Sequence, residues 1–386
     1  MRVALALIFL LCAGAAQADD WRAYHHGIGF VPDGAGRYWV FYSAVDDPKR
    51  EVGDEEEWTH NIYVANWGPK DSGALAPHLF IHRPGAQEPV SVAAMTNGHI
   101  LVTAEDGGDT ENDVDQRYGV YKNDLQPVRR YGYLVREGGH SGHTAAVGDL
   151  FVVFYSHEWV EGGGVDDLGS GDGVYAKIYD SDGGLLRAVP VAARKREWWP
   201  VIAGAPQRAL LVWQKFMRGF SYAALKFTML DPATGQLSPV QMPREDLQYY
   251  TYNAAYMPRI DRFIILGTNK NGRGFGYLVD RLGRITATLL CMPATVREAG
   301  IAIDGDDAYT PGAEDRMLQL HATPTSLTLT GVASSPFTWA EEGSIGLPKG
   351  KGLMHWVSLD RDGLQEADFA AVDFAAPGPS DLCRVP

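Results

Sequence analysis

The amino-acid sequence predicts an all-β chain that folds as a β-propeller, with six blades of four antiparallel strands each. The first observation is a short run of β-branched and aromatic residues that recurs about every 50 to 60 residues, a pitch typical of propeller blades. The second is that no window has the apolar periodicity of a long amphipathic helix, which disfavours α-rich folds. The six runs lie at residues 38–42, 100–103, 151–155, 210–213, 263–266 and 327–330.

Each blade is expected to begin with a strand of small residues, because small side chains suit the crowded position nearest the propeller axis. Such strands precede five of the runs, at residues 27–30, 92–94, 144–147, 201–204 and 253–256. A third strand that stops at an aspartate follows most runs, at residues 175–180, 222–231, 275–280 and 354–360. Asp182-Gly183 and Asp362-Gly363 then predict hairpin turns, since glycine accepts a positive φ, and a fourth strand follows each turn.

The predicted blades start near residues 24, 87, 140, 198, 249 and 317. Residues 292–315 are then an insertion between the fifth and sixth blades, and the count rises to seven if this stretch holds strands of its own. A pair of β-sandwiches is the alternative all-β fold, but it does not account for the regular pitch.

The first 18 residues have the organisation of a cleaved secretory signal. A basic tip, Met1-Arg2, precedes an apolar stretch at residues 3–16 and the small-residue site Ala16-Gln17-Ala18, so we expect cleavage after Ala18. A membrane anchor is the alternative, but the apolar stretch is short for a span and no second one approaches 18 residues. The sequence therefore predicts a periplasmic or secreted, monomeric protein made of one domain, residues 19–386, without a membrane span.

Cleavage would remove Cys12 and leave two cysteines, Cys291 and Cys383. In an oxidising compartment these two can form one disulfide, and two buried free thiols are the alternative.

The charge of the chain limits its partners. With 48 acidic and 34 basic side chains the formal net charge is −14, which disfavours nucleic acid and anionic lipid as partners. Nucleotide-binding glycine motifs, a nucleophile elbow and a zincin sequence are all missing from the sequence. We expect no resident cofactor. The acidic stretch 106–115 fails the EF-hand register, and a loosely bound calcium or other divalent ion there is the alternative.

Blade topology places the unusual residues together. Connections from the fourth strand to the next first strand, and from the second to the third strand, emerge on one face of a propeller, where function concentrates in long loops. Three histidines fall there, His140 and His143 before a first strand and His157 after a second. Neutral imidazoles can act as general bases or bind metal, whereas separate hydrogen bonds to loop backbone are the structural alternative. No ligand spacing indicates a metal.

Paired aromatic residues also stand on this face, and we expect one member of each pair to be exposed as a surface on which sugar rings stack. The candidate ligand-binding aromatics are Trp198, Trp199, Tyr250 and Tyr155.

Residues 140–235 resemble a bacterial propeller repeat with the pattern "GVYA…YDxDG…VVWQ", carried here by residues 173–176, 179–183 and 211–214. The Ser-x-Asp-x-Gly-x-x-Trp box of sialidase-type propellers is absent, which weighs against a sialidase.

A second resemblance concerns about 20 residues. His140, Phe154-Tyr155 and His157 are similar to the His…Phe-Tyr-x-x-His pattern of neuraminidase-repeat-like propellers of the ulvan-lyase type, although the gap is shorter by about three residues. The resemblance implies a β-elimination on uronic-acid polysaccharides, with His140 and His157 in the active site. It also implies a tyrosine and an arginine that the motif does not place.

Loop position alone makes Tyr249 or Tyr250 the candidate tyrosine, and Arg218 or Arg273 the candidate arginine. Two functions follow. The favoured one is binding of a carbohydrate or cell-envelope component through the long-loop face, because the lyase motif is short. The alternative is a polysaccharide lyase. Either site predicts that at least two of the three histidines cluster beside the axial channel, with Arg218 as the nearest cation.

Overall fold

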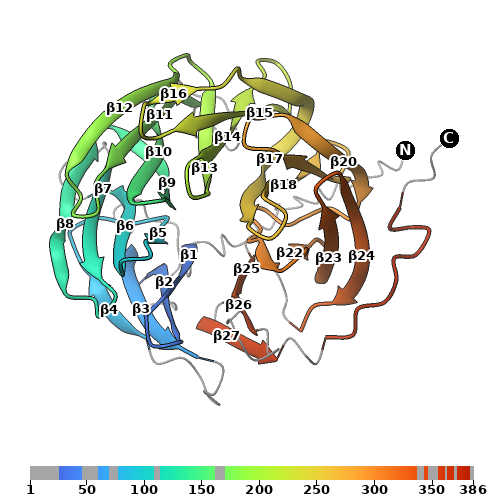
Figure 1. The fold of residues 1–386 in the computed structure, drawn as a ribbon, viewed down its shortest axis with the longest axis horizontal. Coiled ribbons are helices and arrows are strands. Elements are labelled where there is room, and N and C mark those ends of the chain that lie inside the picture. Colours follow the sequence, from blue (N-terminus) through green and yellow to red (C-terminus); the bar gives the residue numbers. More distant parts are fainter. Residues whose placement is uncertain are drawn as a thin grey trace, which may run out of the picture.

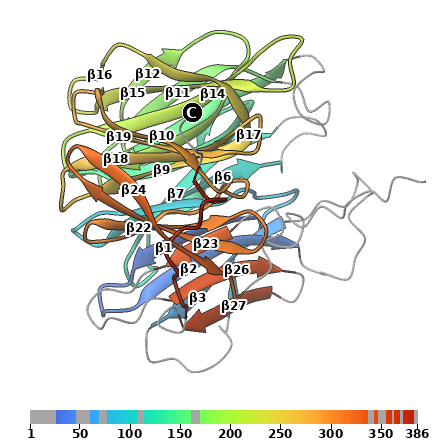
Figure 2. The ribbon, with the colours of Figure 1, turned by 90° about the vertical axis from the view of Figure 1, so that its right-hand side faces the viewer.

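A computed structural model describes residues 26–45, 60–68, 77–107, 114–160, 170–336, 343–346, 355–360, 363–368 and 372–382. The regular elements of these residues are all β-strands, paired antiparallel within each sheet. Figure 1 shows the sheets arranged around a common axis, and Figure 2 shows the same ring from the side. The chain is therefore an all-β propeller, as the sequence predicts.

The first three blades are regular sheets of four strands that follow the order of the chain. Their strands are β1 (His26–Pro32), β2 (Tyr38–Val45), β3 (His60–Trp67), β4 (His78–Ile81), β5 (Ser91–Ala94), β6 (His99–Asp106), β7 (Asp115–Lys122), β8 (Pro127–Arg136), β9 (Gly139–Val147), β10 (Leu150–Val160), β11 (Ser170–Tyr179) and β12 (Leu185–Ala192).

Blades 4 and 5 share one eight-stranded sheet, because the long strand β17 pairs with β15 of blade 4 and then with β18 of blade 5. Blade 6 again has four strands, and the last sheet has three among the described residues. The strands are β13 (Glu197–Gly204), β14 (Ala209–Phe216), β15 (Ala223–Asp231), β16 (Gln236–Leu237), β17 (Gln241–Met257), β18 (Arg262–Asn269), β19 (Gly274–Val279), β20 (Ile285–Met292), β21 (Ala302–Asp304), β22 (Asp307–Gly312), β23 (Arg316–Thr323), β24 (Ser326–Ser334), β25 (Gly343–Gly346), β26 (His355–Asp360) and β27 (Gly363–Asp368).

The described strands thus fall into seven sets rather than the six expected first. Residues 292–315, predicted as an insertion, hold β21 and β22, the first two strands of blade 6. The apolar run at 327–330 was expected to be the second strand of a blade, but it lies in the outermost strand β24. The error arose because β21 is only three residues long and carries no apolar run.

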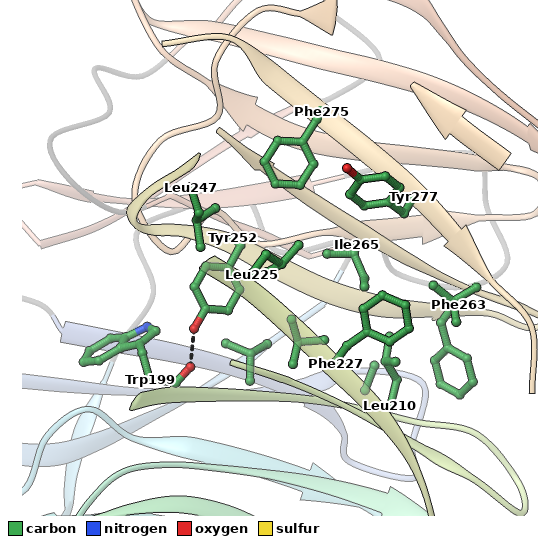
Figure 3. Close-up of a cluster of buried hydrophobic side chains, with 14 of the residues drawn as sticks. Trp199, Leu210, Leu225, Phe227, Leu247, Tyr252, Phe263, Ile265, Phe275 and Tyr277 are labelled. Carbon is green, nitrogen blue, oxygen red and sulfur yellow. Dashed lines mark hydrogen bonds between the residues drawn. The ribbon is translucent and has the colours of Figure 1, made fainter. Parts of the chain in front are cut away.

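The first strand of each blade lies nearest the axis, where β1 lies against β5, β5 against β9, and β9 against β13. Apolar side chains fill the space between successive blades. The layer between blades 4 and 5, drawn in Figure 3, contains Leu210, Phe227, Phe263 and Phe275, all of them fully buried. Burial of such layers is the main source of stability for this fold.

The aspartates at which third strands stop close the following turns, as the sequence predicts. The carboxylate of Asp180 accepts the backbone N–H groups of Asp182 and Gly184 at 3.0 and 2.7 Å. Asp280 binds the N–H groups of Leu282 and Arg284 at 2.9 Å each. These side chains satisfy turn N–H groups that have no strand partner.

Several predictions concern residues outside the described ranges: the signal sequence 1–18, Cys383 and with it the disulfide to Cys291, and the turn residue Asp362. They stay predictions. In the part of the chain that the structure describes, no helix is long and apolar enough to cross a membrane.

Candidate functional site

The register of β9 and β10 separates two of the histidines. His140 lies opposite Ser156 and Gly139 lies opposite His157, so both histidines stand at the same end of the sheet. Successive residues of a strand point to opposite sides, and cross-strand partners point to the same side. His140 therefore faces blade 4, where its ring lies 5.6 Å from that of Trp198, whereas His157 faces blade 2. The expected approach of these two imidazoles does not occur.

The glycines around His140 have a structural role. A Cβ atom on Gly142 would lie 2.3 Å from the side chain of Gln116 in blade 2, and one on Gly139 would lie 3.0 Å from the same residue. The N–H of Gly142 donates to Gln116 Oε1 at 2.9 Å. The glycines at the start of β9 thus allow Gln116 of blade 2 to lie close to the backbone of this strand.

His140 and His143 belong to an aromatic cluster at the starts of the inner strands of blades 3 to 5. His143 lies 6.5 Å from Trp199, and Trp199 lies 4.5 Å from Tyr250, as ring centroids. Backbone geometry explains the cluster: Ser141, Trp199 and Tyr250 have φ of 52°, 57° and 59°. A left-handed residue of this kind marks a bulge that redirects a side chain.

The bulges are fastened to the neighbouring blades. The N–H of Ser141 donates to the carboxylate of Glu105, and that of Tyr250 donates to Gln214 Oε1 at 3.1 Å. The hydroxyl of Tyr252 donates to the carbonyl of Trp199, a bond visible in Figure 3.

The aromatic surface predicted for sugar stacking is largely buried. Trp198, Trp199 and Tyr250 are 2%, 5% and 3% exposed, so the expectation that one tryptophan of the pair faces solvent is wrong. The bulges turn these rings into the layers between blades. Tyr249 is half-buried, stacks on Phe216 at 5.7 Å and donates its hydroxyl to the carbonyl of Phe220 at 3.2 Å.

The cation beside this cluster is one that the sequence reasoning missed. The guanidinium of Arg297 lies 4.4 Å from the ring centre of Tyr250 and 6.0 Å from that of Trp199, and its Nε lies 3.1 Å from Glu298 Oε1. Arg218 and Arg273, the predicted cations, are exposed on loops. The sequence pattern does not indicate Arg297, because that residue lies in residues 292–315, which are predicted to be an insertion between blades.

A cavity of about 370 Å³ opens between blades 2 and 3, on the other side of the sheet from His140. Two predicted residues, Tyr155 and His157, line it because they alternate along β10. Tyr175 lies opposite Tyr155 on β11, so it and Lys177 line the same cavity. The full lining comprises Arg136, Tyr155, His157, Asp172, Tyr175, Ala176, Lys177, Ala188, Val189 and Pro190.

Ring contacts order the aromatic wall of this cavity. Tyr155 and Tyr175 stack with centroids 6.0 Å apart, and the His157 ring stands edge-on to Tyr175 at 5.9 Å. His157 Nδ1 lies 3.8 Å from a carboxylate oxygen of Asp172. Lys177, two residues after Tyr175 on β11, donates its ammonium group to the backbone carbonyl of Val135 in blade 2.

The surroundings change the acidity of two cavity groups. Burial raises the pKa of Tyr155 to about 12, against a smaller opposite effect of the Arg136 charge. Its hydroxyl is therefore protonated at neutral pH and can donate a hydrogen bond. Burial, and then the positive charge of Arg136, lowers the pKa of Lys177. The Arg136 guanidinium is thus close enough to act on both Tyr155 and Lys177.

Sequence reasoning found Tyr155 and His157 but missed Arg136, Asp172, Tyr175 and Lys177 as cavity residues. The signal for Tyr175 and Lys177 was their two-residue spacing on a predicted strand beside Tyr155. Arg136 carried no such signal, because only the packing of blade 2 against blade 3 brings it there.

The structure describes the two ends of the acidic stretch 106–115. Asp106 forms an ion pair with Arg83 at 2.8 Å, and Asp115 forms one with Arg117 at 2.6 Å. Within the described ranges no three His, Cys, Asp or Glu side chains are grouped as a metal site would require. A divalent ion bound by this loop stays a prediction, since residues 108–113 lie outside those ranges.

No protein-family model matches the chain, and no curated protein sequence matches it significantly. Solved structures do match. Hydrazine synthase from Kuenenia stuttgartiensis is similar with a TM-score of 0.58 at 12% identity, over 94% of this chain and 99% of that one. The WD40 domain of Toxoplasma gondii coronin matches with a TM-score of 0.53 at 9% identity, over 89% of this chain and 80% of that one.

A chain from the crystal structure of BBS1N in complex with ARL6DN has a TM-score of 0.51 at 11% identity, over 89% of this chain and 91% of that one. At such identities the likeness shows the fold alone, and that fold is the β-propeller. Propellers of the ulvan-lyase type are not among these three structures.

Proposed function

We propose that this protein binds a carbohydrate in the cavity between blades 2 and 3. The observation that carries the proposal is the wall formed by the rings of Tyr155, Tyr175 and His157. Aromatic rings give sugars an apolar face to stack on, and the remaining lining supplies hydrogen-bond donors.

The shape of the site favours a carbohydrate over an envelope protein. At about 370 Å³ the cavity lies within the ordinary size range of small-ligand pockets, which are concave and have few polar groups. A protein partner would need a wide surface patch instead. The buried ring cluster around Trp199 offers no such patch, so the lateral cavity replaces it as the candidate site.

Calorimetric titration with neutral and acidic oligosaccharides tests this proposal. Tyr175→Ala should weaken binding by roughly tenfold or more, because removal of one aromatic ring from a stacking site costs about 1–3 kcal/mol where the stacked partner is a nucleobase. Tyr133→Ala is the matched control, since that ring is half-exposed on the outer strand of blade 2 and does not line the cavity. Equal binding by both variants, or no binding of any sugar by the unmodified protein, would contradict the proposal.

A polysaccharide lyase is the second candidate, and one observation favours it: His157, two tyrosines and Arg136 line one cavity. Arg136 would hold the uronate carboxylate while His157 takes the proton from the neighbouring carbon. The electron pair forms a carbon–carbon double bond, the bond to the 4-linked oxygen breaks, and a protonated tyrosine supplies the proton to that oxygen. His140, the other histidine of the resemblance, lies across the sheet and takes no part.

Absorbance of the unsaturated uronate product separates the two candidates. A lyase predicts product that is lost in His157→Ala while binding persists. A binding protein predicts titratable affinity with no product.

A further inference from the structure

Two basic side chains share the cavity between blades 2 and 3, in a protein whose net charge is −14. Arg136 ends β8 of blade 2, and Lys177 lies within β11 of blade 3. The ammonium group of Lys177 is tied to the carbonyl of Val135, the residue next to Arg136. This bond fixes one cation beside the other.

The lining of the cavity holds one acidic side chain beside these two cations. That acidic residue is Asp172 of β11, which has a carboxylate oxygen 3.8 Å from His157 Nδ1. Arg136 lowers the pKa of Lys177 in addition to the effect of burial, which is the expected consequence of two cations in one partly dry site. An anion between them would remove this repulsion.

We propose that the ligand is an anionic sugar whose acidic group binds between Arg136 and Lys177. This inference rests on the proposed function and specifies its ligand class. A guanidinium presents two parallel N–H donors to an acidic group, and an ammonium with one N–H on Val135 keeps two more for the same ligand. The sugar ring then lies against Tyr175, beside Pro190, its cross-strand neighbour on β12.

A carboxylate and a sulfate ester can both accept these charged hydrogen bonds, so the experiment compares sugars that carry one or the other group. The unmodified protein is titrated with a galacturonate oligomer, its methyl ester, and neutral and sulfated galactose oligomers of equal length. We expect the acidic oligomer, or the sulfated one, to bind about tenfold more tightly than its neutral counterpart, as charge-assisted hydrogen bonds predict. The arm that gains affinity identifies the acidic group.

Arg136→Gln should weaken binding of the acidic sugar much more than binding of its neutral counterpart, and so remove most of this preference. Arg136 is exposed, so its replacement should not disturb folding. Lys177→Gln should have the same effect, and Arg187→Gln, at an exposed arginine of β12 outside the cavity lining, should have none. Equal affinity for acidic and neutral sugars would overturn this inference and leave the proposed function standing. Failure of every sugar to bind would overturn both.

Discussion

Replacing Tyr252 by phenylalanine should destabilise the protein much more than the same change at Tyr249, three residues earlier on β17. The hydroxyl of Tyr252 donates to the carbonyl of Trp199, which lies at the bulge of blade 4, and the side chain is 2% exposed. Loss of the donor leaves a carbonyl in the buried layer between blades, at a cost of about 1–3 kcal/mol. The ring itself stays, so no large cavity forms.

Tyr249 is the matched control. Its hydroxyl also donates to a backbone carbonyl, that of Phe220, but this bond is open to water, which can replace the lost donor. The expected cost of Tyr249→Phe is about 0.5 kcal/mol or less. Urea unfolding measures both, with a shifted midpoint and an unchanged slope. Equal destabilisation by the two variants would refute the argument that the Tyr252 bond fastens the Trp199 bulge.

Three further predictions follow from the charges. Glu197 is 1% exposed and forms an ion pair with Lys226 at 2.6 Å. Glu197→Gln should therefore lower the free energy of unfolding in urea by about 3–5 kcal/mol, and adding Lys226→Met should restore part of that loss. A Glu197→Gln variant as stable as the unmodified protein would contradict this prediction. Affinity for an acidic sugar should fall as pH rises through the pKa of Lys177, which is lowered below 10.5, because only the ammonium form attracts the anion. Calorimetry of the Lys177→Arg variant should show this fall at a higher pH. An unchanged pH profile in that variant would contradict a role of Lys177 in binding the anion. Burial by itself would raise the pKa of Asp280, but hydrogen bonds from Arg284 and Leu282 lower it overall. Stability should therefore be lost as pH falls toward that folded-state pKa, and Asp280→Asn should flatten this acid dependence in thermal unfolding.

The propeller could be predicted because its repeat lies in the chain itself. Apolar runs such as Phe151–Tyr155 sit in second strands, and aspartates such as Asp180 and Asp280 close the turns after third strands. The sequence predicts a seventh set of strands only if residues 292–315 hold strands of their own, because β21 is too short to have an apolar run that would reveal it.

The site could be predicted only in part, since it depends on which side of a sheet each residue faces. Loop topology correctly brought His140 and His157 to one end of blade 3, but a one-residue offset in register put them on opposite sides. The left-handed backbone of Trp199 and Tyr250 buries rings that a sequence pattern places at the surface. Arg136 reaches the cavity through contact between blades, which no local pattern encodes.

The most direct test of the central proposal is a crystal structure of the protein with an acidic oligosaccharide. Our account predicts a sugar ring in the cavity between blades 2 and 3, against Tyr175, with its acidic group within hydrogen-bond distance of Arg136 and Lys177. A sugar bound instead beside Trp199 and Arg297 near the axis, with the lateral cavity empty, would contradict it.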